Sequence, residues 1–395
     1  MANQAQEART KAIELYVKGE PPSRIATSLG YSRAWIYKWL QRYHSGEKAW
    51  AEDRNRRPRR LPRRTAAATV DAVKATRLFL DQQGVFCGGQ AIAWELEELG
   101  VEARPSLRTI NRILSREGLI RRRTGRYQAK GKKYPRLPAL RANQVHQMDY
   151  VGPCYLRGPL RFYSLNSVDV ATGRCALSPV ISKAGPATLE AIWATWCRLG
   201  IPEHLQVDNE SVFYGSRRYP RGLGLLIRLC LLHEVEPWFI PMGEPWRNGV
   251  VEKFNDHYEG GFLRRVTLGS EEELRRQSLL FEHKHNTRYR YSKLRGQTPE
   301  STLRAMQQPI RFPESMTAPA YPLRRPERGR YHVVRFIRSD GQLDIFGEKH
   351  ALPREAVYEY VIATVDVGEQ KLSAQIDGRT VHEIPYAMPG CDTEG

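Results

Sequence analysis

Hydrophobic positions in the first 120 residues recur at helical spacing. In residues 8–44 this spacing predicts three short helices, with Gly19 and Gly30 ending the first two and Ser32 capping the third. Residues 66–120 repeat the pattern, and Pro105-Ser106 opens the last helix there. Two short helices, a turn and a third helix form the helix-turn-helix arrangement. We therefore predict two all-α helix-turn-helix modules, in residues 1–50 and 66–120.

The pattern changes between residues 143 and 305, where short β-type runs alternate with helical ones. The predicted strands are 145–151, 162–170, 173–181, 204–207 and 236–240. The predicted helices are 186–199, 223–232 and 246–258, followed by a helical stretch over 271–285. Strands followed by alternating helices and strands predict an α/β domain with its sheet in the middle.

The last part of the chain is predicted to be all-β. Prolines spread through residues 306–330 indicate a linker. Beyond it, period-2 runs occupy residues 333–338, 342–346, 358–367, 371–376 and 380–384. Asp377-Gly378 is a hairpin turn sequence between the last two runs. About five short strands predict a small β-barrel over residues 331–386.

The net charge of +19 is concentrated at one end of the 395-residue chain. Residues 1–142 hold 30 Lys and Arg against 13 Asp and Glu, whereas the remainder holds 32 against 30. Charge gathered in this way is typical of a module that binds a polyanion, and nucleic acid is the leading partner. A membrane surface would need a basic amphipathic helix with a bulky apolar face, which the sequence lacks.

Two basic linkers carry part of this charge. Residues 51–65 contain six arginines interleaved with two prolines between positions 55 and 64, and residues 121–142 contain nine Lys and Arg and no acid. Such segments stay extended. They are either solvated connections or strips that follow a phosphate backbone or enter a minor groove.

The candidate DNA-binding residues lie in the third helix of each module and in these linkers. Polar and basic side chains early in such a helix can reach base edges and phosphates. The alternative is a helical bundle with a solvated basic face. The candidates are Arg33, Trp35, Lys38, Arg56, Arg57, Arg59, Arg60, Arg108, Thr109, Asn111, Arg112, Arg121, Arg122 and Arg123.

Composition excludes several other classes of protein. With 41% hydrophobic residues the chain can build folded cores, so it is not a disordered basic protein. No apolar run approaches the roughly 18 residues of a membrane helix, and the N-terminus has no signal-peptide pattern. The six cysteines are scattered without a CxxC pair, which argues against disulfides and thiolate zinc sites. We expect a cytoplasmic protein.

Three carboxylates stand out by their placement. Asp149 lies inside the first predicted strand, Asp208 ends the strand 204–207, and Glu252 lies within the helix 246–258. A lone Asp at a strand end is often only a turn former, as we expect for Asp169. Three convergent carboxylates are instead the hard oxygen ligands that Mg²⁺ prefers. Two such ions would activate the attacking oxygen and stabilise the leaving oxygen of an in-line phosphoryl transfer.

These residues sit in motifs that resemble a known family. Asp149 in a strand, Asp208-Asn209-x-Ser211-x-Phe213 and Pro245-x-x-Asn248-Gly249-x-x-Glu252 resemble the DDE integrase core. That core is the ribonuclease-H-like catalytic domain of bacterial insertion-sequence transposases and retroviral integrases. The preceding tandem helix-turn-helix region resembles the insertion-sequence branch, and the resemblance covers nearly the whole chain.

The resemblance implies a role for each of these side chains. Asp149, Asp208 and Glu252 would be the catalytic residues and metal ligands. Asn209 and Asn248 would support the site, and Lys253 is either a surface ion or a residue that holds a phosphate of the DNA end. Two features depart from the family: Glu210 stands where a glycine is usual, and the Asp208–Glu252 spacing is long, with the extra residues expected in the loop 217–222.

The implied activity is that of a Mg²⁺-dependent polynucleotidyl transferase, with two ions and with Mn²⁺ as an alternative. It would cleave a strand at transposon ends and transfer the 3′-hydroxyl into target DNA, as a homo-oligomer at the bacterial nucleoid. The main rival is a catalytically inactive, transposase-derived regulator that only binds DNA. A third reading is a tyrosine or serine recombinase, whose covalent chemistry would survive metal chelation.

Overall fold

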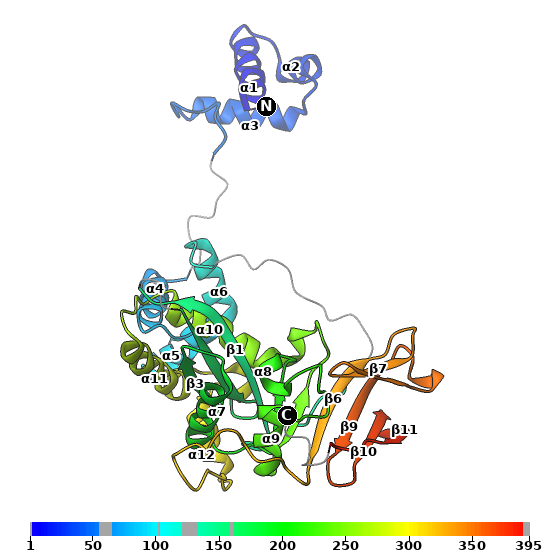
Figure 1. Ribbon diagram of the computed structural model, residues 1–395. Helices are drawn as coiled ribbons and strands as arrows, with labels where there is room; N and C mark the ends of the chain where they lie inside the picture. Colours follow the sequence, from blue (N-terminus) through cyan, green and yellow to red (C-terminus); the bar gives the residue numbers. More distant parts are fainter. Residues whose placement is uncertain (1, 55–64, 102, 121–132, 158–160, 390–395) are drawn as a thin grey trace. The chain divides into compact units, whose positions relative to one another are not determined.

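The computed structural model describes residues 2–54, 65–101, 103–120, 133–157 and 161–389 (Figure 1). The chain divides into two compact units, residues 1–66 and residues 67–395. No helix in these described segments is long and apolar enough to cross a membrane.

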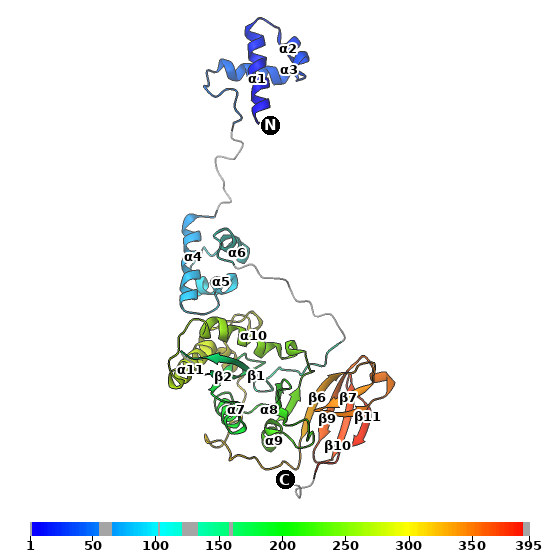
Figure 2. The same ribbon diagram turned by 45° about the horizontal axis from the view of Figure 1, so that its top comes forward.

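The first unit contains the three helices predicted for it (Figure 2). They are α1 (Ala2–Val17), α2 (Pro22–Leu29) and α3 (Arg33–His44). Gly30 ends α2 in the left-handed conformation, with a φ of 72°. The Ser32 hydroxyl accepts a hydrogen bond from the Trp35 amide at 3.2 Å, so it caps α3 as predicted. The buried core consists of Ala12, Ile13, Ile25, Ala26, Ile36 and Leu40.

The second unit begins with a similar set of three helices. They are α4 (Ala67–Gln82), α5 (Gly89–Glu98) and α6 (Leu107–Arg116). Ser106 caps α6 by accepting a hydrogen bond from the Thr109 amide at 3.3 Å. The core residues come from all three helices and are Val73, Leu80, Ile92, Leu96, Ile110, Ile113 and Leu114. Of the apolar stripe that the sequence predicts for α6, Ile110, Ile113 and Leu114 are packed in this core, whereas Leu107 is exposed.

A mixed sheet follows, in the strand order β3-β2-β1-β4-β5. The strands are β1 (Val145–Tyr155), β2 (Arg161–Asp169), β3 (Cys175–Val180), β4 (His204–Val207) and β5 (Glu236–Phe239). β1, β2 and β3 are antiparallel, whereas β4 is parallel to β1 and β5 is parallel to β4. The predicted strands are all present, and β1 sits in the centre of this part of the sheet.

Helices cover both faces of the sheet. One cluster joins α7 (Gly185–Leu199) and α9 (Leu225–Leu232) to side chains of β1 and β4. The other joins α10 (Gly249–Tyr258) and α11 (Glu271–Arg288) to the opposite face. The shorter helices are α8 (Ser211–Tyr214), η1 (Pro245–Asn248), η2 (Glu259–Leu263), η3 (Ser292–Leu294), α12 (Pro299–Met306) and η4 (Arg354–Ala356). The three-layer α/β architecture predicted for this region is therefore present.

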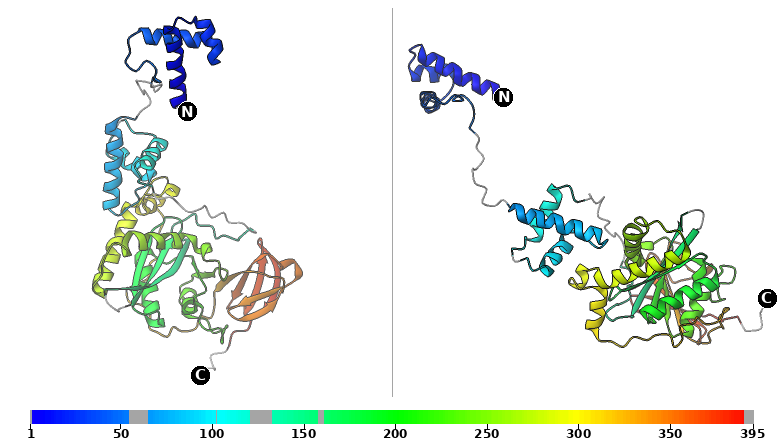
Figure 3. Two further views of the ribbon diagram at one scale, coloured as in Figure 1. Left: turned by 90° about the horizontal axis from the view of Figure 1, so that it is seen from above. Right: turned by 90° about the vertical axis from the view of Figure 1, so that its left-hand side faces the viewer.

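The described C-terminal part of the chain adds six strands, four of which extend the same sheet. They are β6 (Arg330–Phe336), β7 (Gln342–Ile345), β8 (Glu348–Ala351), β9 (Tyr360–Asp366), β10 (Lys371–Ile376) and β11 (Arg379–Pro385), the orange-to-red part of Figure 3. β6 pairs in parallel with β5, and the order continues through β9 and β10 to β11. β7 pairs with β8 in a separate hairpin.

The predicted small β-barrel is not confirmed, because the sheet stays open. Within the described residues no pairing joins β11 back to β6, since one edge of β6 is taken by β5 and the other by β9. The hairpin turn predicted at Asp377-Gly378 does join β10 to β11, and Ile376 pairs with Arg379 across it. Both turn residues have positive φ, as a two-residue hairpin requires.

The buried His146 makes core stability depend on pH. Burial lowers its pKa to about 4, so the unfolded chain, with an ordinary value near 6.5, takes up a proton first. The free energy of unfolding is therefore expected to be level above about pH 6.5 and to fall toward pH 4, by about 3 kcal/mol from this residue. Urea titrations followed by tryptophan fluorescence should show a shallower pH dependence for His146→Asn. An unchanged slope in that variant would contradict this assignment.

Candidate active site

The strand register brings two of the candidate carboxylates together. β1 and β4 are adjacent parallel strands, with Val145 opposite His204 and Gln147 opposite Gln206. Continuing this register by two residues places Asp208 beside Asp149. Adjacent strands lie about 4.8 Å apart, so the two carboxylates share one edge of the site. Glu252 lies in the first turn of α10, the helix that packs over β1 and β2.

Side chains around Asp149 fix where α10 begins. The Gln147 side-chain oxygen accepts hydrogen bonds from the amides of Val250 (2.8 Å) and Val251 (3.2 Å). These are among the amides that a helix N-terminus leaves without an internal partner. The buried Asn248 donates to the Met148 carbonyl at 3.0 Å. Asn248 therefore ties η1 to β1, and Gln147 is a further residue of the candidate site that the sequence does not predict.

Asn255 is a second supporting residue that the sequence reading missed. Its amide donates to Asp149 Oδ2 at 2.8 Å, and its oxygen accepts from Asn166 at 2.9 Å. Ser164 donates in turn to Asn166 at 2.7 Å. This chain of hydrogen bonds fixes the orientation of the Asp149 carboxylate. The signal in the sequence was the position of Asn255 three residues after Glu252, on the same helix face.

Burial raises the pKa of all three carboxyl groups. Burial, together with the charges of Asp208 and Glu252, raises the pKa of Asp149 to about 7. The pKa of Asp208 is raised mainly by burial, and that of Glu252 by burial and by the charges of Asp256 and Asp208. A bound cation would favour the ionised form of these carboxyl groups. Perturbed, partly buried acids of this kind are typical of functional sites.

The residues fit a magnesium ion in part. No three His, Cys, Asp or Glu side chains in the described segments gather closely enough to form a metal-binding group, so the full predicted ligand set is not assembled. Asp149 and Asp208 remain as a neighbouring pair of oxygen donors. Mg²⁺ is commonly held by one or two carboxylates together with waters and substrate phosphates. The chemistry of this pair therefore fits Mg²⁺, with Glu252 beside it on α10.

Glu210, the residue that departs from the family pattern, has a cationic partner. Its carboxylate forms an ion pair with the ammonium of Lys183. The same ammonium lies 4.5 Å from the ring centre of Tyr150 and 4.8 Å from that of Tyr163. The Glu210 backbone amide donates to Asp208 Oδ1 at 3.1 Å. Lys183 therefore balances the extra negative charge at the edge of the site, and sequence spacing gave no sign of it.

The other two supporting candidates are engaged elsewhere. Asn209 donates to the Ile240 carbonyl and accepts from Arg335 at 2.9 Å. Lys253 forms an exposed ion pair with Asp256 at 2.9 Å, one helical turn along α10. Asp169 accepts hydrogen bonds from the Ala171 amide and the Thr172 hydroxyl, which is the turn-forming role expected of it.

The DNA-binding candidates divide into three groups. Arg33 and Lys38 on α3 are exposed, whereas Trp35 is half-buried and stacks on Tyr31 with 4.0 Å between ring centres. On α6, Arg108, Asn111 and Arg112 are exposed, and the half-buried Thr109 shares a hydrogen bond with Ser106. The linker candidates Arg56, Arg57, Arg59, Arg60, Arg121, Arg122 and Arg123 lie outside the described residues.

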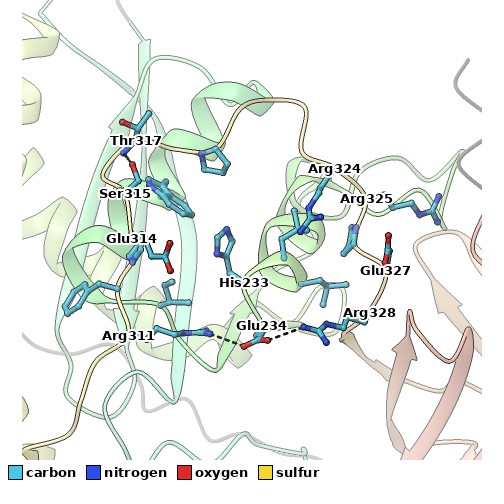
Figure 4. A pocket seen from close by; sticks show the side chains of 18 residues that line it. His233, Glu234, Arg311, Glu314, Ser315, Thr317, Arg324, Arg325, Glu327 and Arg328 are labelled. Carbon is cyan, nitrogen blue, oxygen red and sulfur yellow. Dashed lines mark hydrogen bonds and ion pairs between the residues drawn. The ribbon is translucent and has the colours of Figure 1, made fainter.

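A large cavity lies away from the carboxylates (Figure 4). It measures about 830 Å³ and lies between α7, the end of α9 and the segment 311–328. Arg311 and Arg328 line it, and both pair with Glu234, at 3.6 and 3.7 Å. Asp149, Asp208 and Glu252 are not among its lining residues. The carboxylate site is thus separate from this cavity.

Comparison with known proteins identifies the first module. Residues 3–51 match the family described as a homeodomain-like domain, which confirms the helix-turn-helix prediction there. Among solved structures, the chain is similar to the HTLV-2 integrase catalytic core domain in complex with magnesium (dimeric form). The two are 18% identical over 42% of this chain and 99% of that chain, with a TM-score of 0.33.

A second similar structure is the simian T-cell lymphotropic virus intasome in complex with PP2A regulatory subunit B56 gamma. It is 14% identical, over 80% of this chain and 97% of that chain, with a TM-score of 0.38.

Proposed function

We propose that this chain is a DNA transposase of the DDE type. The observations that carry the proposal are the neighbouring positions of Asp149 and Asp208 in the register of β1 and β4, and the raised pKa of both groups and of Glu252 on α10. The homeodomain-like module and the charge of residues 1–142 support DNA as the substrate. A phosphodiester is the bond that acidic, metal-binding side chains in a DNA-binding protein are suited to transfer.

Asp149 and Asp208 would hold Mg²⁺, or Mn²⁺ in its place, and Glu252 would complete the site. Two bound ions would supply activation of the attacking oxygen and stabilisation of the leaving oxygen. Asn255 holds the Asp149 carboxylate in place, and Lys183 balances the charge of Glu210. The two three-helix modules and the basic linkers would hold the DNA against this edge.

The proposed reaction has two steps, strand cleavage and strand transfer. Water attacks a phosphorus at the transposon end, the bond to the 3′ oxygen breaks, and a 3′-hydroxyl and a 5′-phosphate remain. That hydroxyl then attacks a target phosphodiester and displaces the target's own 3′-hydroxyl. Joining two ends to one target requires more than one copy of the chain, so we propose a homo-oligomer acting on DNA in a bacterial cytoplasm.

Product analysis tests this proposal. The full chain is incubated in Mg²⁺ with labelled DNA from the regions flanking its gene and with a circular target. The expected product is flanking DNA joined through its 3′ end to the target, with no protein attached. A covalent protein–DNA adduct formed in EDTA would instead indicate a serine or tyrosine recombinase.

A DNA-binding regulator without catalytic activity is the second candidate. It is favoured by the incomplete assembly of the three carboxylates within the described residues. Binding of the flanking DNA with no cleavage in Mg²⁺ or Mn²⁺, by a folded protein, would establish this candidate and exclude the first.

Lys183 offers a prediction specific to this chain. Lys183→Met leaves the Glu210 charge unbalanced beside Asp208, and we expect cleavage to slow by about 10-fold. The double variant Lys183→Met/Glu210→Gln should recover most of the rate, because both charges are gone. Lys371→Met is the matched control, since this lysine forms ion pairs with Glu369 and Glu383. Equal rates for the single and double variants would refute this role.

A further inference from the structure

A buried arginine of the C-terminal strands reaches the loop that follows Asp208. Arg335 lies on β6 and is only 6% exposed. β6 pairs with β5, and β5 pairs with β4. Arg335 is therefore two strands away from β4, which ends directly before Asp208. Burying a charged group is unfavourable unless its donors are satisfied, so the contacts of Arg335 indicate its role.

The guanidinium of Arg335 donates four hydrogen bonds to backbone and side-chain oxygens. Nη2 donates to Asn209 Oδ1 at 2.9 Å, and Nε donates to the Asp344 carbonyl at 3.0 Å. Nη1 donates to the carbonyls of Ile240 (3.2 Å) and Val334 (2.9 Å). Ile240 also accepts from Asn209, so the ends of β4 and β5 are clamped together. The fork geometry of arginine allows one side chain to make all these bonds.

The C-terminal strands hold a second segment of the site. Tyr360 on β9 donates to the Glu244 carboxylate at 2.9 Å and accepts from Arg247 at 2.8 Å. Arg247 and Glu244 also form an ion pair at 2.7 Å. This network contains the first part of η1, which leads directly into α10 and Glu252. The C-terminal strands therefore contact two of the segments that carry the candidate carboxylates, namely the loop after Asp208 and the turn that precedes α10.

We propose that Arg335 is a positioning residue of the active site, acting through Asn209 to set the position of Asp208. The C-terminal extension of the sheet is then a support for catalysis rather than a separate binding domain. This inference rests on the proposed transposase function. Tyr360 has the corresponding role for the segment that precedes Glu252.

Kinetics of full-length variants test the proposal. Arg335→Met and Arg335→Lys should each slow cleavage of the flanking DNA by about 10- to 100-fold, because neither replacement can bond Asn209 and the three carbonyls together. The Mg²⁺ concentration for half-maximal rate should rise, while DNA affinity stays unchanged. Arg330→Met is the matched control, because Arg330 lies on the same strand but is exposed and forms an ion pair with Asp366. It should behave like the wild type.

Asn209→Ala separates positioning from folding. It removes the acceptor on the active-site side and leaves the carbonyls bonded to Arg335, so it should reproduce the raised Mg²⁺ requirement. The double variant Asn209→Ala/Arg335→Met should be no slower than the slower single variant. Each single variant already removes the Arg335–Asn209 hydrogen bond through which Arg335 is proposed to act. If Arg335→Met fails to fold, the Asn209→Ala result decides.

Two results would overturn this inference. One is a wild-type rate and Mg²⁺ requirement in folded Asn209→Ala and Arg335→Lys proteins. The other is a slower rate with an unchanged Mg²⁺ requirement, which indicates a purely structural arginine. If the proposed transposase function itself were wrong, the wild-type protein would bind the DNA without cleaving it. That result is different from a failure of the role proposed for Arg335.

Discussion

Replacement of Asp208 by Asn is expected to slow DNA cleavage by at least about 1000-fold, or about 4 kcal/mol of transition-state stabilisation. The change keeps the shape of the side chain but removes the negative charge that stands beside Asp149 in the register of β1 and β4. DNA affinity should be unchanged, because the helix-turn-helix module lies in a separate compact unit. Single-turnover cleavage and fluorescence anisotropy measure the two quantities.

A neighbouring acid provides the control for this experiment. Asp256 lies on α10 one turn after Glu252, but its carboxylate is exposed and paired with Lys253. Asp256→Asn should therefore retain most of the activity, whereas Asp149→Asn should match Asp208→Asn. A folded Asp208→Asn protein that cleaves at the wild-type rate would rule out this carboxylate as a ligand.

Deletion of residues 1–66 is expected to weaken DNA binding by about 100-fold or more at low salt. This unit carries 15 Lys and Arg against 6 Asp and Glu, and it contains the homeodomain-like module. Each lost phosphate contact should also reduce the slope of log affinity against log salt by about 0.9. Anisotropy titrations at several salt concentrations measure both effects.

Matched point variants locate this binding surface. Arg33→Ala/Lys38→Ala removes two exposed charges from α3, and Lys11→Ala/Lys18→Ala removes two exposed charges from α1 and the turn that follows it. The first pair should weaken binding and change sequence preference, because α3 is the expected recognition helix. Equal effects of the two pairs would show that α3 has no special role and that charge alone matters.

Much of the local structure could be predicted because its causes are local. Ser32 and Ser106 each cap a helix, because the serine hydroxyl accepts a hydrogen bond from the backbone amide three residues further along the chain. The sequence of residues 204–207 predicts a short strand, which puts Asp208 at the strand end. The resemblance to the integrase core implies that Asp149 and Asp208 lie close together, and β4 does lie parallel to β1.

The supports of the site could not be predicted, because each joins positions far apart in the sequence. Gln147 is separated from Val250 by about a hundred residues, and Arg335 from Asn209 by 126. Neither contact leaves a periodic or motif signal. The pairing of Lys183 with Glu210 is of the same kind, although Glu210 was noticed as a departure from the family.

The missing barrel has a similar physical cause. Alternating residues specify that a segment such as β6 is a strand, but they do not specify its partner. The hairpin from β10 to β11 was predictable because Asp377-Gly378 encodes the turn itself. The parallel pairing of Trp238 with His332 has no such local signal, and it is this pairing that joins the C-terminal strands to the core.

The Mg²⁺ dependence of DNA cleavage tests the central claim most directly. The full chain is mixed with labelled flanking DNA at pH 8, where Asp149, with a pKa of about 7, is ionised. The expected result is a cleavage rate that rises and saturates with Mg²⁺ and disappears in EDTA. Cleavage that continues at the same rate in EDTA would contradict the assignment of Asp149, Asp208 and Glu252 as a metal-dependent active site.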